Sequence, residues 1–263
     1  MLTKKMLCKH LSEDRSGEII CLDSAPSTNT IAGFLAQEHN TDGTVVIANS
    51  QTKGSGRLGR SFYSPGAVGI YFSYIKVLPK NTKNLGLLTS FAGLAVSDAV
   101  STVCGIQPGI KWPNDILIDG KKICGILTKL KTDPKTNTIT QAIIGVGVNV
   151  NQTEGEFPPD LAQKAGSLRM ALGKPVDRAR LCSEIIVQMD KLLFDEDALC
   201  GDATAYVERL SELSCTIGKS VTVATPDGEE TATAIAIAPD GGLVVKTPTG
   251  TRVIRSGEID DNY

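Results

Sequence analysis

The sequence predicts an α+β protein in which a larger domain of strands and helices is followed by a small β-barrel. Up to residue 213, β-rich segments and segments of helical periodicity follow one another irregularly, which favours a sheet packed against helices. From Cys215 onward, short β-rich runs are separated by Pro-Asp-Gly turns at 226–228 and 239–242, which is typical of a small barrel. We therefore expect two domains, residues 1–214 and 215–263.

The composition is that of an ordinary globular protein, and it argues against several classes. The chain has 263 residues, of which 41% are hydrophobic and 21% charged, and its net charge is −2. An acidic chain argues against a general nucleic-acid binder. No apolar run approaches the ~18 residues of a membrane span, and the N-terminus lacks the apolar core of a signal peptide. We expect a cytoplasmic protein that contacts neither DNA nor a membrane.

The cysteines and histidines limit the chemistry. Seven cysteines are scattered without a C-x-x-C pair, which indicates buried thiols in a reducing compartment rather than a disulfide framework. The two histidines, His10 and His39, are too few for a zinc site or for a catalytic triad built on histidine.

The order of the elements follows from hydrophobic periodicity. Residues 1–17 are polar and are expected to be peripheral. Strands are expected at 18–23, 44–48, 68–77 and 138–150, and helices at 31–38, 85–103, 177–194 and 203–213. Asp119-Gly120 separates two further β-rich arms, which is a strong hairpin signal. We expect the helix at 85–103 to be the main buried helix.

Residues 51–65 form a loop of unusual composition, Gln-Thr-Lys-Gly-Ser-Gly-Arg-Leu-Gly-Arg-Ser-Phe-Tyr-Ser-Pro. Glycines at this density let successive backbone N–H groups approach a ligand, and such groups form a concavity that binds anions. Nearby arginines add charge-assisted contacts to phosphate or carboxylate. The glycines and cations are Gly54, Gly56, Gly59, Lys53, Arg57 and Arg60. The alternative is a flexible, solvated basic loop.

Two phosphate-binding motifs match this loop by accident. Residues 54–59 fit the dinucleotide pattern G-x-G-x-x-G, and residues 54–61 come within one residue of the P-loop pattern. Both motifs need a helix directly after the glycines, because the helix N-terminus holds the phosphate. Here a turn and the β-rich run 68–77 follow instead. We therefore predict an anion-binding loop between two strands.

Ser27, Thr28 and Asn29 lie at a corner between a strand and a helix. Such residues usually cap the helix by accepting hydrogen bonds from its first N–H groups. Capping needs only one of the three. The other interpretation is that their side chains face a ligand.

Residues 110–127 carry polar side chains among apolar strand positions. Lysine and carboxylate side chains are rarely buried unless they are paired or contact a ligand. The residues concerned are Lys111, Asn114, Asp115 and Lys122. The structural alternative is a salt bridge between Lys111 and Asp115 across the hairpin. Trp112, the only tryptophan, is expected to pack rather than to stack on a ligand.

These blocks resemble biotin–protein ligases. The matching segments occur in order, span roughly residues 18–255 and include the small C-terminal domain. They are Ser-Thr-Asn at 27–29, Gln-Thr-Lys-Gly-Ser-Gly-Arg-Leu-Gly-Arg at 51–60, Lys-Trp-Pro-Asn-Asp at 111–115, Lys-Ile-Cys-Gly-Ile-Leu at 122–127 and Gly-Val-Gly-Val-Asn-Val at 145–150. The N-terminus is too short for the winged helix of the bifunctional ligase–repressors, so the resemblance is to the single-function form.

The resemblance implies a fold, a reaction and partners. The fold would be α+β, with a mixed-sheet catalytic domain of the biotin/lipoate ligase type and a small SH3-like β-barrel. Biotin and Mg²⁺-ATP would give biotinyl-5′-AMP and pyrophosphate, and the biotinyl group would then pass to a lysine of a biotin carboxyl carrier protein or domain. The resemblance leaves a homodimer open.

The resemblance also assigns roles to residues. Biotin would be bound by Ser27, Thr28, Asn29, Gln51, Ser55, Gly56, Arg57 and Lys122. Lys122 and Arg57 would be the catalytic cations. ATP would be bound by Arg60, Lys111, Asn114, Asp115 and Asn149, with Asp115 as the candidate magnesium ligand. Many members of the family have arginine where this chain has Ser55, which bears on how long the adenylate is retained.

Two other functions compete with this interpretation. A lipoate–protein ligase shares the catalytic architecture, but the 51–60 and 111–115 blocks follow the biotin pattern. A non-catalytic nucleotide-binding module is disfavoured by the acidic chain and by a barrel without an aromatic residue before Tyr263, because single-strand binding uses stacking surfaces and a basic groove.

Overall fold

A computed structural model describes residues 1–38, 41–225, 228–255 and 260–261. Its larger part is built on one mixed sheet of seven strands in the order β1-β2-β3-β7-β6-β5-β4. Only β1 and β2 pair in parallel, and the other neighbours are antiparallel. The strands are β1 (Ile19–Leu22), β2 (Val45–Ala48), β3 (Ile70–Val77), β4 (Gly109–Lys111), β5 (Asp115–Ile118), β6 (Lys121–Thr132) and β7 (Ile139–Val148). The prediction of an α+β fold with a mixed sheet is confirmed.

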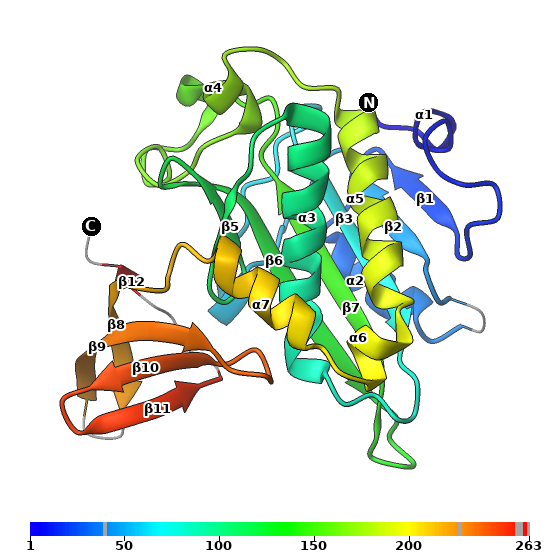
Figure 1. Cartoon of the computed structure of the whole chain (residues 1–263). Helices are drawn as coiled ribbons and strands as arrows, with labels where there is room; N and C mark the ends of the chain where they lie inside the picture. Colours follow the sequence, from blue (N-terminus) through cyan, green and yellow to red (C-terminus); the bar gives the residue numbers. More distant parts are fainter. Residues whose placement is uncertain (39–40, 226–227, 256–259, 262–263) are drawn as a thin grey trace.

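Helices cover both faces of this sheet (Figure 1). The long helices α3 (Leu88–Cys104) and α5 (Arg178–Leu193) pack on each other and on one face, where they enclose the main hydrophobic core. Helix α2 (Thr28–Leu35) packs on the other face over β2, β3 and β7, with a smaller core beneath it. The shorter helices are α1 (Lys4–Leu7), α4 (Leu168–Leu172), α6 (Glu196–Cys200) and α7 (Thr204–Leu213).

The expectation that no apolar run approaches the length of a membrane span is wrong for the segment Leu85–Cys104, which contains α3 and is long and apolar enough by length and composition. In this fold, 67% of its most apolar window is buried. The helix is therefore the central helix of the core, as its sequence predicts.

The hairpin predicted at Asp119-Gly120 is confirmed. β5 ends at Ile118 and β6 begins at Lys121, so the turn has two residues. Both have positive φ, 49° for Asp119 and 74° for Gly120, which is the conformation of the favoured two-residue hairpin turn. The turn places Leu117 opposite Lys122, and a register shift between Ile116 and Leu117 then places Asp115 opposite Gly125.

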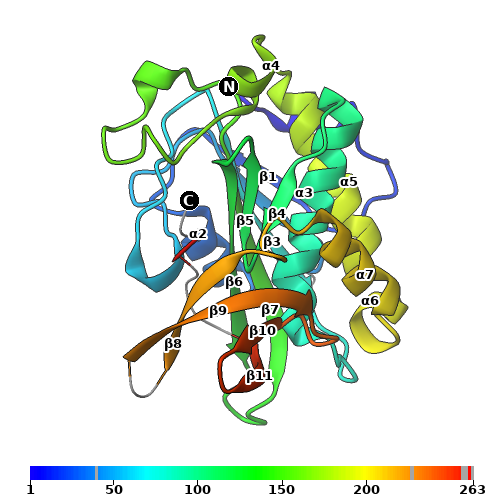
Figure 2. The same ribbon diagram turned by 60° about the vertical axis from the view of Figure 1, so that its left-hand side comes forward.

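The small C-terminal part is an antiparallel sheet of five strands in the order β11-β10-β9-β8-β12 (Figure 2). The strands are β8 (Ser220–Thr225), β9 (Gly228–Ile237), β10 (Leu243–Thr247), β11 (Gly250–Ile254) and β12 (Asp260–Asp261). The predicted turn at 226–228 lies mostly outside the described residues, and that at 239–242 joins β9 to β10. The domain boundary at residue 214 stays a prediction.

Two expectations about the N-terminal half are wrong in detail. Helix α2 begins at Thr28, three residues before the predicted start, so the polar corner forms its first turn. Residues 1–17 are not peripheral, because Leu2 and Leu7 are buried in the main core. The surrounding polar residues concealed these two leucines in the sequence.

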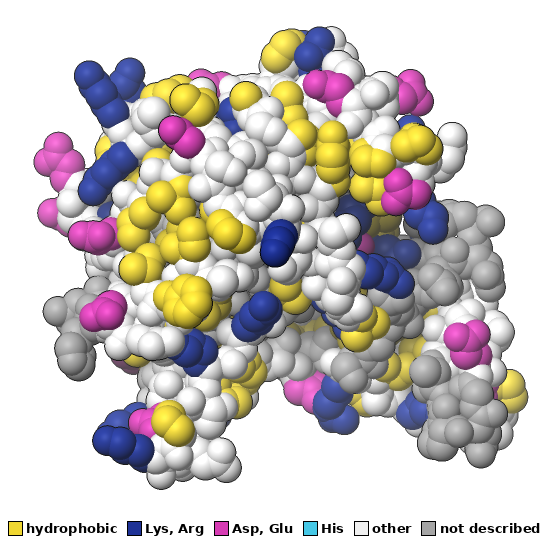
Figure 3. All heavy atoms as spheres, turned by 180° about the vertical axis from the view of Figure 1, so that it is seen from behind, with side chains coloured by type: hydrophobic (Ala, Val, Ile, Leu, Met, Phe, Trp, Pro, Cys, Tyr) yellow, Lys and Arg dark blue, Asp and Glu magenta, His cyan; other side chains and the backbone are white. Residues whose placement is uncertain are grey.

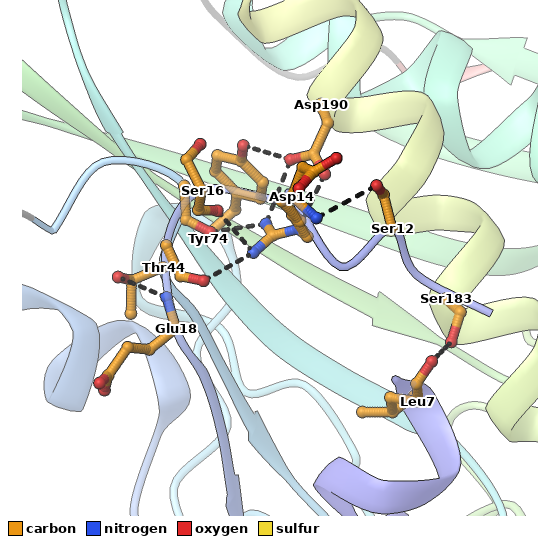
Figure 4. A network of polar contacts seen from close by, with 12 residues as sticks. Leu7, Ser12, Asp14, Ser16, Glu18, Thr44, Tyr74, Ser183 and Asp190 are labelled. Carbon is orange, nitrogen blue, oxygen red and sulfur yellow. Dashed lines mark hydrogen bonds and ion pairs between the residues drawn. The ribbon is translucent and has the colours of Figure 1, made fainter. Parts of the chain in front are cut away.

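A polar network ties the N-terminal segment to the core (Figure 4). The Arg15 guanidinium donates to Asp190 on α5 at 2.8 and 3.1 Å and to the Gly43 carbonyl at 2.6 Å. The Tyr74 hydroxyl donates to the same carboxylate at 2.6 Å. Burial raises the pKa of Asp190, while its contacts with Tyr74 and Arg15 act in the opposite direction. The buried carboxylate therefore depends on these partners to stay ionised.

We expect Arg15→Ala to lower the free energy of unfolding by about 3 kcal/mol, because it leaves a buried carboxylate without its cation. A carboxyl with a raised pKa contributes stability below that pKa and loses it as the pH rises, so the loss should be larger at about pH 8 than at about pH 5. Urea unfolding followed by circular dichroism measures both. Arg255→Ala removes the partner of Asp240 from an ion pair in which both side chains are exposed, and it should cost less than about 1 kcal/mol. Equal losses in the two variants would contradict the role of the network.

Candidate active site

A cavity of about 670 Å³ collects the residues that the sequence singles out. Its walls come from the start of α2, the 51–65 loop, the segment between β4 and β5, the β5–β6 hairpin and β7. Every predicted site residue except Asn149 lines it. On the face opposite α3 and α5, lysine and arginine side chains gather along a hollow beside the small domain (Figure 3).

One end of the cavity is a cluster of hydroxyl and amide groups at the start of α2. Ser27 occupies the N-cap position but makes no side-chain cap hydrogen bond. The Thr28 N–H instead donates to Gln51 Oε1 at 2.8 Å, and Gln51 Nε2 donates to Ser64 Oγ at 2.9 Å. The capping interpretation is therefore wrong for the Ser27 side chain, and Gln51 satisfies the amide of the first helical turn.

Ser73 belongs to the same cluster, and sequence reasoning missed it. Its hydroxyl, fully buried on β3, lies 2.8 Å from Thr28 Oγ1 and 2.6 Å from Asn29 Oδ1. The Asn29 amide also donates to the Leu127 carbonyl at 3.3 Å. A polar residue at a fully buried strand position is the signal that could have found Ser73.

The glycine-rich loop is ordered by its own backbone. Ser55 and Ser61 form a β-bridge, and the Gly56 N–H donates to the Arg60 carbonyl at 2.7 Å. At the tip, Leu58 and Gly59 have φ of 52° and 77°. Leu58 is 75% exposed there. Strand β3 follows the loop without an intervening helix, so the rejection of the two nucleotide-binding motifs is confirmed.

A hydrogen bond joins the loop to the segment between β4 and β5. Arg57 Nη1 donates to Asn114 Oδ1 at 3.0 Å. Asn114 is itself held by the strand beside it, because its side-chain amide donates to the Ile126 carbonyl at 3.1 Å. Two motifs that lie 57 residues apart in the sequence therefore form one wall of the cavity.

The hairpin places a lysine and a carboxylate side by side. Lys122 Nζ lies 2.7 Å from Asp115 Oδ1, with 37% and 24% of the two side chains exposed. Lys111 lies opposite Asp115 in the register of β4 and β5. The salt bridge considered from the sequence, between Lys111 and Asp115, is therefore wrong in its cation, because Asp115 pairs with Lys122. Lys111 lines the same cavity.

Asn149 lies behind this wall rather than on it. Its side-chain amide is 3.4 Å from the Lys122 carbonyl and its Oδ1 accepts from Gln152 at 3.2 Å. Its backbone N–H donates to the Ile123 carbonyl at 2.7 Å. In this structure Asn149 holds the strand that carries Lys122.

Glycines on the central strands make room for side chains above the sheet. A Cβ on Gly147 would lie 2.5 Å from the Phe62 ring, and one on Gly145 would lie 2.6 Å from the Asn29 amide. Gly125 lies beneath Phe62 and the end of the Lys122 side chain in the same way. Glycine at these positions therefore leaves room for two side chains that line the cavity, Phe62 and Asn29.

A second cavity of about 580 Å³ adjoins the first. The residues that line both cavities are Arg57, Trp112, Pro113, Asn114, Ile126 and Leu127. The second continues toward the small domain, where Lys83 and Arg255 contribute two further cations. Asp240, which pairs with Arg255 at 2.5 Å, is also part of its lining.

The comparisons with known proteins agree with this geometry. Residues 21–149 match the biotin/lipoate A/B protein ligase family, and residues 216–260 match the biotin protein ligase C terminal domain. The bifunctional ligase/repressor BirA of Bacillus subtilis is 34% identical over 242 residues, which cover 92% of this chain and 73% of that protein. The chain belongs to the biotin/lipoate A/B protein ligase family.

Other members of the family match over nearly the whole chain. The biotin–[acetyl-CoA-carboxylase] ligase of Mycobacterium tuberculosis is 32% identical over 247 residues, which cover 89% of this chain and 86% of that protein. The biotin protein ligase of Aquifex aeolicus, solved in complex with biotin and ATP, superposes with a TM-score of 0.78 at 30% identity and covers 92% of this chain and 97% of its own. The predictions of family and fold are confirmed.

We expect Gly147→Ala to displace Phe62 and loosen the loop, because the added methyl group would overlap the ring. Overpacking of this kind costs about 1–3 kcal/mol of folding free energy. Hydrogen exchange of the amides at 54–62 should accelerate, and urea unfolding measures the loss of stability. Gly155→Ala, where a Cβ meets nothing within 4 Å, is the control. Unchanged exchange in the loop would show that Phe62 does not hold it.

Proposed function

We propose that this chain is an ATP-dependent biotin–protein ligase. It forms biotinyl-5′-AMP from biotin and ATP with release of pyrophosphate, and it transfers the biotinyl group to a lysine of a biotin carboxyl carrier domain. The observation that carries the proposal is a single cavity that joins a hydroxyl and amide cluster to a wall bearing Lys122 and Arg57. The family and the named relatives support the same activity.

The hydroxyl and amide cluster fits the ureido ring of biotin. That ring presents one carbonyl acceptor and two N–H donors, and a site built from such partners discriminates strongly against analogues that lack them. The donors and acceptors that line this end come from Ser27, Thr28, Asn29 and Gln51, while the buried Ser73 holds Thr28 and Asn29 from behind. Phe62 and Phe72 supply apolar surface beside them for the rest of the molecule. Biotin in this orientation would extend its carboxylate toward the cationic wall.

The cationic wall fits the first half-reaction. An oxygen of the biotin carboxylate forms a bond to the α-phosphorus of ATP, and the bond from that phosphorus to the bridging oxygen breaks, so that pyrophosphate leaves. Two anions must approach each other, and cations already aimed at the site lower this barrier. Lys122 and Arg57 are placed to do so, with Ser55 and Gly56 in the covering loop. Asp115 holds the Lys122 ammonium in position by their ion pair.

The second half-reaction needs no residue that acts as a nucleophile. The amine of the acceptor lysine attacks the acyl carbon of the adenylate, an amide bond forms, and the bond to AMP breaks. The amine proton leaves to solvent. What the site must do is keep water from the mixed anhydride until the acceptor arrives. The 51–65 loop lies over the cavity and is suited to this task.

The ATP-binding residues fit the remainder of the wall. Arg60, Lys111, Asn114 and Asp115 line the cavity beyond Lys122, and Asn149 acts from behind. The second cavity, with Lys83 and Arg255, lies where a leaving pyrophosphate can be bound. Arginine and lysine side chains commonly bind phosphate groups through charge-assisted hydrogen bonds.

Magnesium fits this site as a partner of ATP rather than as a resident ion. No group of three or more His, Cys, Asp or Glu side chains lies together within the described part of the chain. Mg²⁺ is commonly held by one or two carboxylates together with substrate phosphates. Asp115 is the carboxylate that would hold it here, and the ion would neutralise charge on the phosphates.

The acceptor protein, the cellular location and the oligomeric state are considered with the same activity in view. A ligase of this family acts on a biotin carrier protein, and we propose the carrier domain of a biotin-dependent carboxylase. A cytoplasmic location, a chain that contacts neither DNA nor membrane, and a homodimer stay predictions. Lipoate as the substrate is disfavoured, because residues 216–260 match a domain of the biotin branch.

We expect Lys122→Ala to slow formation of biotinyl-AMP by about 10²–10³-fold, the usual effect of removing one group that stabilises developing charge. The side chain is partly exposed, so the fold should survive, as circular dichroism would show. Single-turnover formation of the adenylate from labelled ATP is the measurement. Lys129→Ala removes an exposed cation from the same strand and should leave the rate unchanged. An unaltered rate in Lys122→Ala would refute the proposed role.

We expect Arg57→Ala to weaken biotin binding and to release adenylate into solution. Loss of a charge-assisted contact corresponds to about 10- to 100-fold in affinity. Calorimetry measures biotin binding, and rapid filtration after one turnover measures the adenylate that escapes. Lys53→Ala, on an exposed position of the same loop that does not line the cavity, is the control. Tight retention by Arg57→Ala would contradict a covering role for the loop.

A further inference from the structure

Trp112 lies at the centre of the active-site segment, yet its side chain belongs to the core of the small domain. The indole is 5% exposed and packs with Val221, Val223, Leu243 and Val245 among the buried residues of the C-terminal sheet. Within the described residues, Trp112 is the one buried member of this cluster that precedes residue 216. Trp112 and its chain neighbours on both sides also line the active-site cavity.

Two hydrogen bonds fix the tryptophan in this position. The indole Nε1 donates to the Gly241 carbonyl at 2.9 Å, and both groups are buried. The Trp112 backbone N–H donates to the fully buried Thr216 Oγ1 at 3.0 Å. The small domain therefore holds residue 112 through its side chain and through its backbone.

The contacts around Trp112 reinforce this docking. The Cys215 N–H donates to the Ile110 carbonyl at 3.0 Å, two residues before Trp112. The turn at Asp240-Gly241 packs so closely on the larger domain that a Cβ on Gly86 would lie 2.4 Å from the Asp240 carbonyl oxygen. The segment from Ile110 to Trp112 is thus held between the two parts of the chain.

The residues that follow Trp112 belong to the reaction site. Asn114 accepts from Arg57, and Asp115 pairs with Lys122. Asn114 and Asp115 follow Trp112 by two and three residues, so their positions depend on where the tryptophan is held. A displacement of about 1 Å at a reacting group can reduce a rate about 10²-fold.

We propose that Trp112 is a positioning residue that couples docking of the C-terminal β-domain to the placement of Asn114 and Asp115 in the adenylation site. The proposal rests on the proposed ligase activity for its kinetic test. Through this side chain, the small domain contributes to the first half-reaction, and none of the strand residues in its core lines either cavity. The hydroxyl and amide cluster at the start of α2 makes no hydrogen bond with Trp112 among the described residues.

The first test separates ATP chemistry from biotin binding. Trp112→Ala should lower kcat for biotin-dependent ATP–pyrophosphate exchange about 100-fold. The Kd for biotin without ATP should rise less than about tenfold, because the hydroxyl and amide cluster at the start of α2 is untouched and only the contacts of Arg57 and Lys122 are disturbed. Trp112→Phe keeps the apolar contact and loses the bond to Gly241, so its kcat should fall about fivefold. Ile186→Ala, in the main core on α5, should lower stability without changing kcat of the folded enzyme. Parallel losses of kcat and biotin affinity in Trp112→Ala would overturn the proposal.

The second test needs no enzymatic activity. Leu243→Ala loosens the small-domain core at a residue that lines neither cavity. Hydrogen exchange of the amides at 109–118 should accelerate about tenfold or more, while that at 45–48 stays unchanged. Emission of the single tryptophan should shift to the red as docking weakens. Unchanged exchange at 109–118 would overturn the coupling, whereas a wild-type enzyme without biotin-dependent exchange activity would overturn only the proposed function.

Discussion

The ion pair between Lys122 and Asp115 is the contact on which the charge balance of the site depends. Six lysine and arginine residues line the cavity, and their mutual repulsion is unfavourable unless anions accompany them. With the cavity empty, Asp115 provides one such anion at 2.7 Å from the Lys122 ammonium. When a carboxylate and a polyphosphate enter, they supply the remaining negative charge. The charges of the site are therefore better balanced when both reactants are bound than when the cavity holds only solvent.

The elements that carry this arrangement could be predicted from the sequence. The Asp119-Gly120 dipeptide favours a two-residue turn in which both residues have positive φ. It therefore predicts the hairpin and the position of Lys122 within it. The glycine-rich loop could be assigned to a connection between strands because no helical segment follows it. The roles of individual residues came from the resemblance to a family, since charge and spacing alone left a salt bridge and a ligand site equally plausible.

The remaining features depend on contacts between distant segments, which local patterns do not encode. Ser73 lies in a strand that reads as uniformly buried, and only the packing of α2 above it reveals its partners. Leu2 and Leu7 lie among polar residues, and their burial depends on α5. Packing could be expected for Trp112, but the core it enters belongs to strands more than 100 residues away. Tertiary structure decided each of these cases.

The most direct test is ATP–pyrophosphate exchange by the purified protein with biotin and, in parallel, with lipoate. Exchange depends only on the first half-reaction, so it requires no knowledge of the acceptor protein. We predict exchange that requires biotin and is not supported by lipoate. Exchange with lipoate alone would assign the chain to the lipoate branch of its family. Absence of exchange with either acid would mean that the cavity binds its ligands without activating them, and this would contradict the account.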